Sequence, residues 1–342
     1  STYLMAIRHL VFHRLTRWQD DQPAKILTGT ETKDANADHQ ALFSQYKKLF
    51  QFRAGKAFGR FSETELQSPF TPWLKEFNDG SLSFASLTTN ALNHLCELAN
   101  KTPEIFDRHV LFVDEEHADG DRFWIFLLED SSGLMLDGNS ELTIVDYLNT
   151  SKLELALKVD ISAWLSDSDD TSYLSLIKGR GTSKLGEAFS QSAGFENSVD
   201  IAKETETLME ILSNYTKDTE KDEAAQVRQR AYDFCVEQQQ MGEAVPLSEL
   251  SGYLDENKPS KFAEFAEQSA NIAPTQELRP DTRKLKHLVR LSGKGNGLSL
   301  SFSSDLFQQT ILYDESSDTL TITAIPKSLK KQLSEFIKDK ED

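Results

Sequence analysis

The sequence predicts an α+β fold in two domains, residues 1–200 and 201–342. The chain has 342 residues, which is longer than the length that a single hydrophobic core usually organises. Its first part alternates short strand-like and helix-like segments, whereas charged helical sequence follows residue 201 and strands return near the end. We therefore expect an N-terminal mixed sheet with helices, and a C-terminal helical region ending in a small antiparallel sheet.

The N-terminal elements follow from the spacing of apolar residues. Alternating or continuous apolar runs predict strands at residues 7–12, 24–27, 109–113, 123–129, 141–145 and 153–161. Apolar residues that recur every three or four positions predict helices at 38–52 and 84–98. Two acidic turns, at 114–121 and 137–140, separate the strands in the middle of this domain.

The C-terminal elements follow in the same way. Helices are predicted at residues 201–242, with a break near 216–222, and at 247–254, 261–268 and 328–338. Strands are predicted at 288–291, 298–302, 310–313 and 319–323. The last two strands flank five turn-forming residues, which suits a hairpin.

Composition limits the protein class. No apolar run approaches the roughly 18 residues of a membrane span, and the first 18 residues carry three arginines and no signal-peptide pattern. Cys96 and Cys235 are far apart, which favours a reducing compartment over a disulfide framework. We therefore expect a cytoplasmic protein without membrane contact. Its net charge of −18 argues against a simple DNA binder, because phosphate affinity comes from Lys and Arg that release counterions.

The charge is nevertheless segregated along the chain. Residues 107–146 hold eleven acids against Arg108 and Arg122. Residues 47–60 hold five Lys or Arg and no acid, and residues 279–294 hold six against one acid. Local basic faces are therefore compatible with a negative total.

Two basic clusters are the candidate DNA contacts. One is an acid-free run just before a helix that begins near Ser183, where helix N-terminal amides could also receive a phosphate. The other could extend a similar face in the second domain. The residues predicted to contact DNA are Lys178, Arg180, Lys184, Arg283, Lys284, Lys286, Arg290 and Lys294. The alternative is that these charges are solvated and balance nearby acids.

Motifs for catalysis or metal binding fail on spacing. Residues 179–184 have the wrong order for a P-loop, and residues 293–297 precede strand sequence instead of a helix. His9 and His13 stand four apart, but on a predicted strand, and the acids of 114–121 miss a calcium-loop register. No Gly-x-Ser-x-Gly elbow occurs. We predict no catalytic residue, no metal and no cofactor. The alternative from this part of the sequence is a hydrolase that uses clustered acids and a divalent metal.

Several ordered runs carry a resemblance to a known family. They are residues 160–164, 173–180, 232–238, 242–251, 293–302 and 313–322, with weaker matches at His13-x-Leu15 and Gly59-x-Phe61-Ser62. In these runs the chain resembles bacterial nucleoid-associated proteins of the NdpA/YejK type. The resemblance covers most of the chain and is strongest beyond residue 155; the first 150 residues depart from it. It implies association with the nucleoid and DNA binding, and it brings no catalytic residues.

The function predicted from the sequence is a non-enzymatic, nucleoid-associated protein that binds double-stranded DNA with little sequence specificity and helps to organise the chromosome. Phosphate contacts of this kind weaken steeply with salt. The alternative is an acidic adaptor that docks a topoisomerase or another DNA-processing protein without strong DNA binding of its own. A homodimer is left open, as is the role of the acidic region 107–146.

Overall fold

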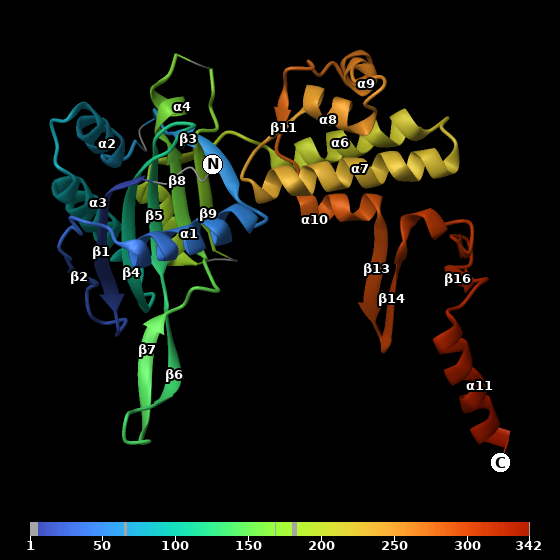
Figure 1. The fold of residues 1–342 in the computed structure, drawn as a ribbon, viewed down its shortest axis with the longest axis horizontal. Helices are drawn as coiled ribbons and strands as arrows, with labels where there is room; N and C mark the ends of the chain where they lie inside the picture. Colours follow the sequence, from blue (N-terminus) through green and yellow to red (C-terminus); the bar gives the residue numbers. More distant parts are fainter. Residues whose placement is uncertain (1–5, 65–66, 168, 180–182, 342) are drawn as a thin grey trace. The chain divides into compact units, whose positions relative to one another are not determined.

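A computed structural model describes residues 6–64, 67–167, 169–179 and 183–341 (Figure 1). The chain divides into two compact units, Ser1–Asp200 and Ile201–Asp342, called unit 1 and unit 2. Unit 1 is built on a large sheet, and unit 2 is helical and ends in small antiparallel hairpins. The predicted α+β class is therefore confirmed. Among the described residues, no helix is long and apolar enough to cross a membrane.

Eight strands form the sheet of unit 1. In spatial order they are β10 (Phe195–Asn197), β3 (Ala57–Phe61), β9 (Leu174–Lys178), β8 (Leu155–Asp160), β5 (Arg122–Leu128), β4 (Phe106–Glu116), β1 (Ala6–Arg17) and β2 (Lys25–Leu27). Every described pairing within it is antiparallel, where the sequence predicted a mixed sheet. A physical reason is visible between β4 and β5: five residues connect them, enough for a hairpin but too few for the crossover that parallel strands need.

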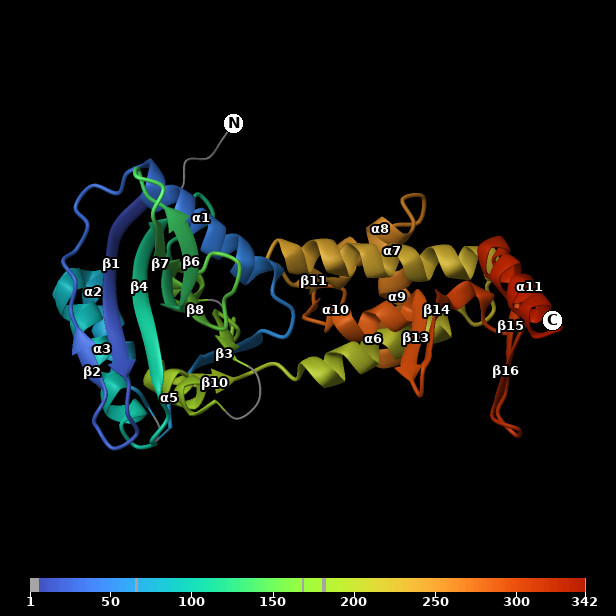
Figure 2. The ribbon, with the colours of Figure 1, turned by 90° about the horizontal axis from the view of Figure 1, so that it is seen from below.

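Helices cover both faces of this sheet (Figure 2). Helix α1 (Ala37–Phe52) covers one face, where its Phe43 and Phe50 pack on Trp124. Three helices cover the other face: α2 (Phe70–Asp79), α3 (Phe84–Ala99) and α5 (Lys184–Ser192). The short helix α4 (Ile161–Leu165) follows β8. Burial on both faces explains why β5 is a continuous apolar run instead of an alternating one.

One hairpin stands apart from the sheet. Strands β6 (Asp130–Leu136) and β7 (Leu142–Leu148) pair only with each other, and Figure 1 shows them projecting from unit 1. The sequence predicted a strand at 141–145 but missed β6. We call residues 130–148, the two strands with their connecting turn, the acidic hairpin, because they hold four Asp or Glu and residues 123–151 contain no Lys or Arg.

Unit 2 is a helical unit with a core of its own. Its helices are α6 (Ile201–Thr216), α7 (Lys221–Gln240), α8 (Leu247–Leu254) and α9 (Lys261–Ala270), followed by α10 (Thr282–Leu285) and the 3-10 turn η1 (Lys286–Leu288). A two-stranded ladder pairs β11 (Val245–Pro246) with β12 (Glu277–Leu278). Cys235 lies in this core and Cys96 in unit 1, and both are free thiols.

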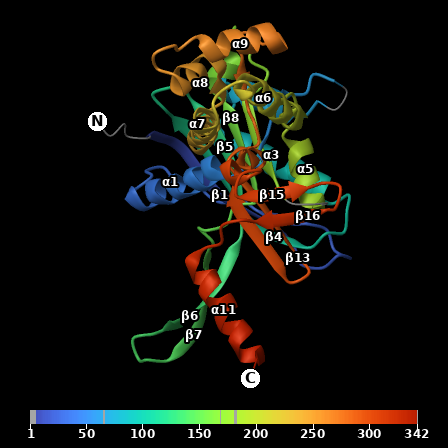
Figure 3. The same cartoon turned by 90° about the vertical axis from the view of Figure 1, so that its right-hand side faces the viewer.

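Two hairpins and a helix complete unit 2 (Figure 3). They are β13 (Arg290–Gly295) with β14 (Leu298–Ser303), the 3-10 turn η2 (Ser304–Leu306), β15 (Ile311–Asp314) with β16 (Thr319–Ile322), and α11 (Lys327–Glu341). Asn296 and Gly297 turn the first hairpin with φ of 50° and 79°. An Asn-Gly pair adopts such positive values at low cost, which explains the tight connection. The strand predicted at 288–291 starts at Arg290, because Leu288 belongs to η1.

Candidate nucleic-acid interface

The predicted basic residues of unit 2 lie on one continuous segment formed by α10, η1 and β13. Leu285 and Leu288 are buried in the core of unit 2, where α10 and η1 contact α7. Thr282 is buried as well, and the cations that fall between the buried positions are exposed: Arg283, Lys284 and Lys286. Burial of every third position therefore fixes the backbone of this segment and directs its charged side chains to solvent.

Strand β13 continues the row of cations. Arg290 and Lys294 are four residues apart on one strand, so they share a face of the β13–β14 hairpin. Their cross-strand partners on β14 are serines, and Arg290 Nε donates to Ser301 Oγ at 2.6 Å. The apolar residues of the hairpin lie on the opposite face. We call Arg283, Lys284, Lys286, Arg290 and Lys294 the basic strip.

One member of the basic strip is neutralised. The Arg283 guanidinium donates to both carboxylate oxygens of Asp281, at 3.1 and 3.0 Å. Partial burial raises the pKa of Asp281, but the hydrogen bonds from Arg283 outweigh it and the pKa is lowered overall. The hydrogen bond to Asp281 in turn raises the pKa of Arg283. No described carboxylate lies within ion-pair distance of the other four cations, which leaves their charge available to a phosphate.

The predicted cluster of unit 1 is weaker. Lys178 Nζ lies 2.8 Å from Glu187 Oε1, and Lys184 is exposed at the start of α5. The amide of Leu185 donates to Glu104 Oε2 at 2.9 Å, and Ser183 Oγ accepts from the amide of Gly186. The start of α5 therefore has fewer amides open to a phosphate than the sequence suggested.

Arg180, the third predicted residue of that cluster, lies outside the described residues. Lys178 and Lys184 belong to unit 1, whereas the basic strip belongs to unit 2. The predicted DNA contacts are thus divided between two units.

Cations of the acid-free run at 47–60 make contacts within unit 1. Lys47 is buried and its Nζ lies 2.5 Å from Glu115 Oε2. Lys56 is buried as well and donates to carbonyl oxygens at the end of α1, including that of Phe50 at 3.0 Å. Arg60 Nε lies 2.7 Å from Glu196 Oε2. This part of the sequence therefore does not form the basic face that its composition allowed.

Much of the acidity of residues 107–146 is compensated inside unit 1. Arg14 pairs with Asp107 at 2.7 Å, and Arg8 pairs with Asp114 and Asp121 at 3.3 and 2.8 Å. The acidic hairpin differs, because its acids are exposed or half-exposed beside apolar side chains. Its large aliphatic residues are Leu134, Leu136, Leu142 and Ile144, which are 64–75% exposed.

The sequence reasoning missed two charged features. One is the acidic hairpin, whose first strand contains Ser-Ser-Gly and so resembled a turn. The other is the positive charge of α11, a helix that the apolar period predicts at residues 328–338. Its lysines are Lys327, Lys330, Lys331, Lys338 and Lys340. Their number, in fifteen residues with a helical apolar period, was the signal that could have found this feature.

A cavity of about 480 Å³ in unit 1 is lined by several charged side chains. Its lining includes His9, whose Nδ1 lies 2.5 Å from Glu31 Oε1 and whose ring stacks on Phe84 at 4.9 Å. Arg8 holds Asp114 and Asp121 at the same cavity. Each of these charged groups already has a partner in the protein, so the cavity presents an internally compensated network. No group of three metal-ligating side chains occurs among the described residues.

Comparison with known proteins gives one consistent result. A family described as "Nucleoid-associated protein YejK" matches residues 11–330. A nucleoid-associated protein of Pseudomonas savastanoi is 31% identical over 331 residues, covering 96% of this chain and 99% of the relative. One of Azotobacter vinelandii is 31% identical over 335 residues, covering 96% and 98%. One of Pseudomonas aeruginosa is 30% identical over 334 residues, covering 96% and 97%.

Proposed function

The chain belongs to the family of nucleoid-associated protein YejK, and from this premise we propose that it binds double-stranded DNA directly through the basic strip of unit 2. Family membership gives it a nucleoid-associated role and places it outside the known enzyme families. The proposal adds the contact surface and the mode of binding. In this mode the protein binds DNA phosphates in the nucleoid and does not catalyse a reaction.

The proposal rests on a row of four cations whose side chains are exposed and have no described carboxylate partner: Lys284, Lys286, Arg290 and Lys294. Arg290 and Lys294 lie about 13 Å apart along an extended strand, at roughly 3.3 Å per residue. One DNA strand places a phosphate about every 3.4 Å along the helix axis, so the row spans several phosphates. Flexible lysines on a rigid strand suit phosphate contact without base reading.

The negative net charge of the chain limits its affinity for DNA. A net charge of −18 opposes the approach of a polyanion over most of the surface, so only the local strip favours it. Four phosphate contacts give a salt slope of about −4, and affinity should then fall roughly a hundredfold between about 50 and 200 mM salt. Phosphate contacts of this kind do not select a specific operator.

The test is a duplex titration by fluorescence anisotropy at about 50 and about 200 mM salt. The variant Lys284→Gln/Lys286→Gln/Arg290→Gln/Lys294→Gln should lose most of the affinity and nearly all of its salt dependence. The matched variant Lys178→Gln/Lys184→Gln, which removes two cations from unit 1, should bind nearly as well as wild type. Wild-type affinity that ignores salt, or equal losses in the two variants, would overturn the assignment to the basic strip.

A second candidate function has its own observation. The acidic hairpin exposes aliphatic side chains among acids and cannot favour DNA, so it suits a protein partner whose surface is apolar and basic. This supports the adaptor role, in which the chain docks a DNA-processing enzyme such as a topoisomerase. Co-sedimentation of purified topoisomerase with wild type, but not with Leu136→Ser/Ile144→Ser, is the expected result. Equal co-sedimentation of both proteins would remove the hairpin from this role.

A further inference from the structure

The β13–β14 hairpin of unit 2 is thin and lacks acids. Seven of the fourteen residues 290–303 are Gly or Ser, and none is Asp or Glu. Glycine inside a strand weakens it and often marks a place where a ligand or another backbone approaches closely. A Cβ added at Gly293 or Gly295 would meet nothing within 4 Å, so the described part of the chain makes no such approach. The glycines therefore keep the hairpin thin for a partner that the described residues do not supply.

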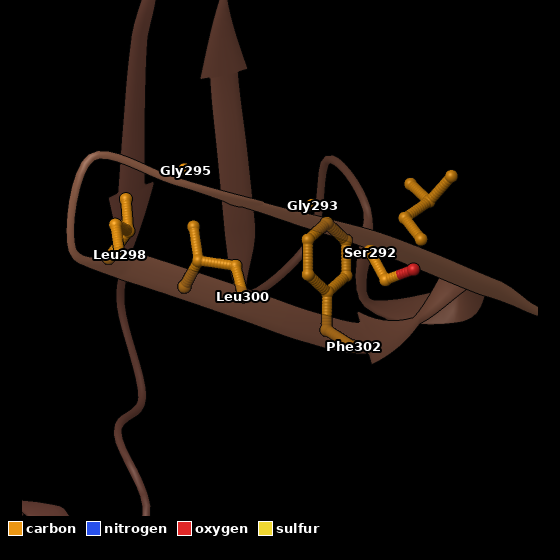
Figure 4. A pocket seen from close by; sticks show the side chains of 7 residues that line it. Ser292, Gly293, Gly295, Leu298, Leu300 and Phe302 are labelled. Atoms are coloured by element: carbon orange, nitrogen blue, oxygen red, sulfur yellow. The ribbon is translucent and has the colours of Figure 1, made fainter.

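The two faces of this hairpin differ in chemistry. One face is cationic and rich in hydroxyl groups, and consists of Arg290, Ser292, Lys294, Ser299, Ser301 and Ser303. The other face is apolar and holds an open groove of about 350 Å³, where Leu298, Leu300 and Phe302 lie in a row beside the glycines (Figure 4). A partner that contacts both faces must therefore offer anionic groups and apolar surface close together.

The apolar face becomes more exposed towards the tip of the hairpin. Leu291 pairs with Phe302 at the base, where both side chains are half-buried. Leu298 pairs with Gly295 in the last register position before the turn, and it is 59% exposed. Because the glycine opposite it has no side chain, Leu298 has no cross-strand neighbour to cover it. The tip therefore presents one large apolar side chain at the end of a thin ribbon.

The minor groove of duplex DNA offers the matching surfaces. Its rims are phosphates, and its walls are deoxyribose rings, whose carbon–hydrogen faces are apolar. The groove is about 6 Å wide and paired strands lie about 4.8 Å apart, so a ribbon enters only if its side chains are small. The major groove, about 12 Å wide, admits a ribbon with ordinary side chains and gives the glycines no role. An apolar protein surface would match one face of the hairpin but not its cations.

We propose that the β13–β14 hairpin enters the minor groove and that Leu298 inserts between two base pairs, so that the protein bends the duplex it binds. Insertion of an apolar side chain from the minor groove opens the groove and kinks DNA by about 20–90°. Arg290 and Lys294 then reach the phosphates at the rim through their long side chains. The inference rests on the DNA binding proposed above, and it adds the groove, the inserted residue and the deformation.

The test is energy transfer between dyes at the two ends of a duplex of about 20 base pairs, which is roughly 68 Å long when straight. Saturating wild-type protein should raise the transfer, because a bend brings the ends together. Leu298→Ser should still bind in the anisotropy titration but lose most of this rise. The matched control Leu27→Ser changes a leucine of unit 1 that is 68% exposed, and it should bend DNA as wild type does.

A second variant thickens the hairpin without changing its charge. Gly293→Val/Gly295→Val adds side chains that favour strands and meet nothing within 4 Å, so thermal unfolding should show a protein at least as stable as wild type. It should nevertheless bind DNA more weakly and lose the rise in transfer, because the ribbon no longer fits the minor groove.

Competition identifies the groove. A dye that binds the minor groove should displace wild-type protein from the duplex. Methyl groups at C5 of cytosine project into the major groove and should leave the affinity unchanged. Weaker binding to methylated DNA, without competition from the dye, would overturn entry into the minor groove.

The inference and the proposed function fail in different ways. Wild-type protein that binds with the expected salt dependence but leaves the transfer at the value of free DNA would overturn insertion and leave the basic strip intact. A rise with Leu298→Ser as large as with wild type would also overturn it. Affinity that ignores salt contradicts the basic strip instead, and absence of DNA binding would overturn both.

Discussion

Lys47 Nζ lies 2.5 Å from Glu115 Oε2 in the core of unit 1, where their side chains are 7% and 0% exposed. Trp124 Nε1 donates to the other carboxylate oxygen of Glu115 at 3.1 Å. Lys47 also lies over the rings of Phe43 and Trp124, at 5.3 and 5.8 Å from their centres. An ion pair therefore stands between α1 and the sheet, enclosed by aromatic side chains. Each charge is tolerable there because the other is present.

Removing one partner of this pair should destabilise unit 1. Lys47→Met leaves Glu115 charged and buried without its cation, which costs about 3–5 kcal/mol of unfolding free energy. Glu115→Leu should cost a similar amount. The double variant Lys47→Met/Glu115→Leu should cost much less than the sum, because apolar side chains of similar size then replace both charges.

Tryptophan fluorescence in urea is a selective measurement for this pair. All four tryptophans of the chain, at positions 18, 73, 124 and 164, lie in unit 1, so the signal follows the unfolding of that unit. Additive costs in the double variant would show that the two charges do not compensate each other.

His13 should make unit 1 sensitive to acid. Burial lowers the pKa of His13 from 6.5 to about 4, and its ring contacts Thr88 Oγ1 and the amide of Gly29. Because the unfolded chain takes up a proton near pH 6.5 and the folded chain does not, stability is complete above pH 6.5. It falls as the pH drops from 6.5 to 4, by about 3 kcal/mol.

The measurement is the urea midpoint at neutral pH and near pH 4.5, followed by tryptophan fluorescence. His13→Gln should lose most of the difference between the two pH values. His287→Gln changes an exposed histidine of unit 2 and should keep the wild-type difference. The same difference in all three proteins would assign the acid sensitivity to other groups.

Gly186 should be intolerant of a side chain because α5 lies very close to β9. A Cβ at this position would come within 2.2 Å of the carbonyl oxygen of Lys178. Gly186→Ala must therefore move the helix away from the strand, at a cost of about 1–3 kcal/mol, although alanine favours helix. Gly138→Ala is the control, since its Cβ would meet nothing within 4 Å. Equal unfolding midpoints for the two variants would contradict the close approach of α5 and β9.

The sequence predicted elements with a clear period and missed short or polar ones. The helices α1 and α3 were predicted within one or two residues, because their apolar residues recur on one face. Strand β3 was missed because Ala57–Phe61 is short and contains glycine and arginine. Strand β6 was missed because its sequence Ser-Ser-Gly resembles a turn. In both cases pairing with other strands, which no local pattern shows, decides the structure.

The candidate site follows the same logic. The basic strip is contiguous in sequence, so its cations could be identified from spacing alone. The run that contains Lys47 appeared equally basic, but Glu115 lies 68 residues away and only the folded sheet brings it to Lys47. Lys178 likewise meets Glu187 only after α5 packs on β9. Sequence therefore locates cations, and tertiary structure decides which of them reach solvent without a partner.

The basic strip makes a last prediction about two arginines that carry the same charge. Arg290 has no described carboxylate partner, so Arg290→Gln should lower the magnitude of the salt slope of DNA binding by about 0.9. The charge of Arg283 is matched by Asp281 at 3.0 Å. The double variant Asp281→Asn/Arg283→Gln removes this pair without changing net charge and keeps a side chain that can cap α10. Its slope should stay at the wild-type value. Anisotropy titrations over a salt series measure both slopes, and a fall in the double variant as large as in Arg290→Gln would show that Arg283 leaves Asp281 to bind phosphate.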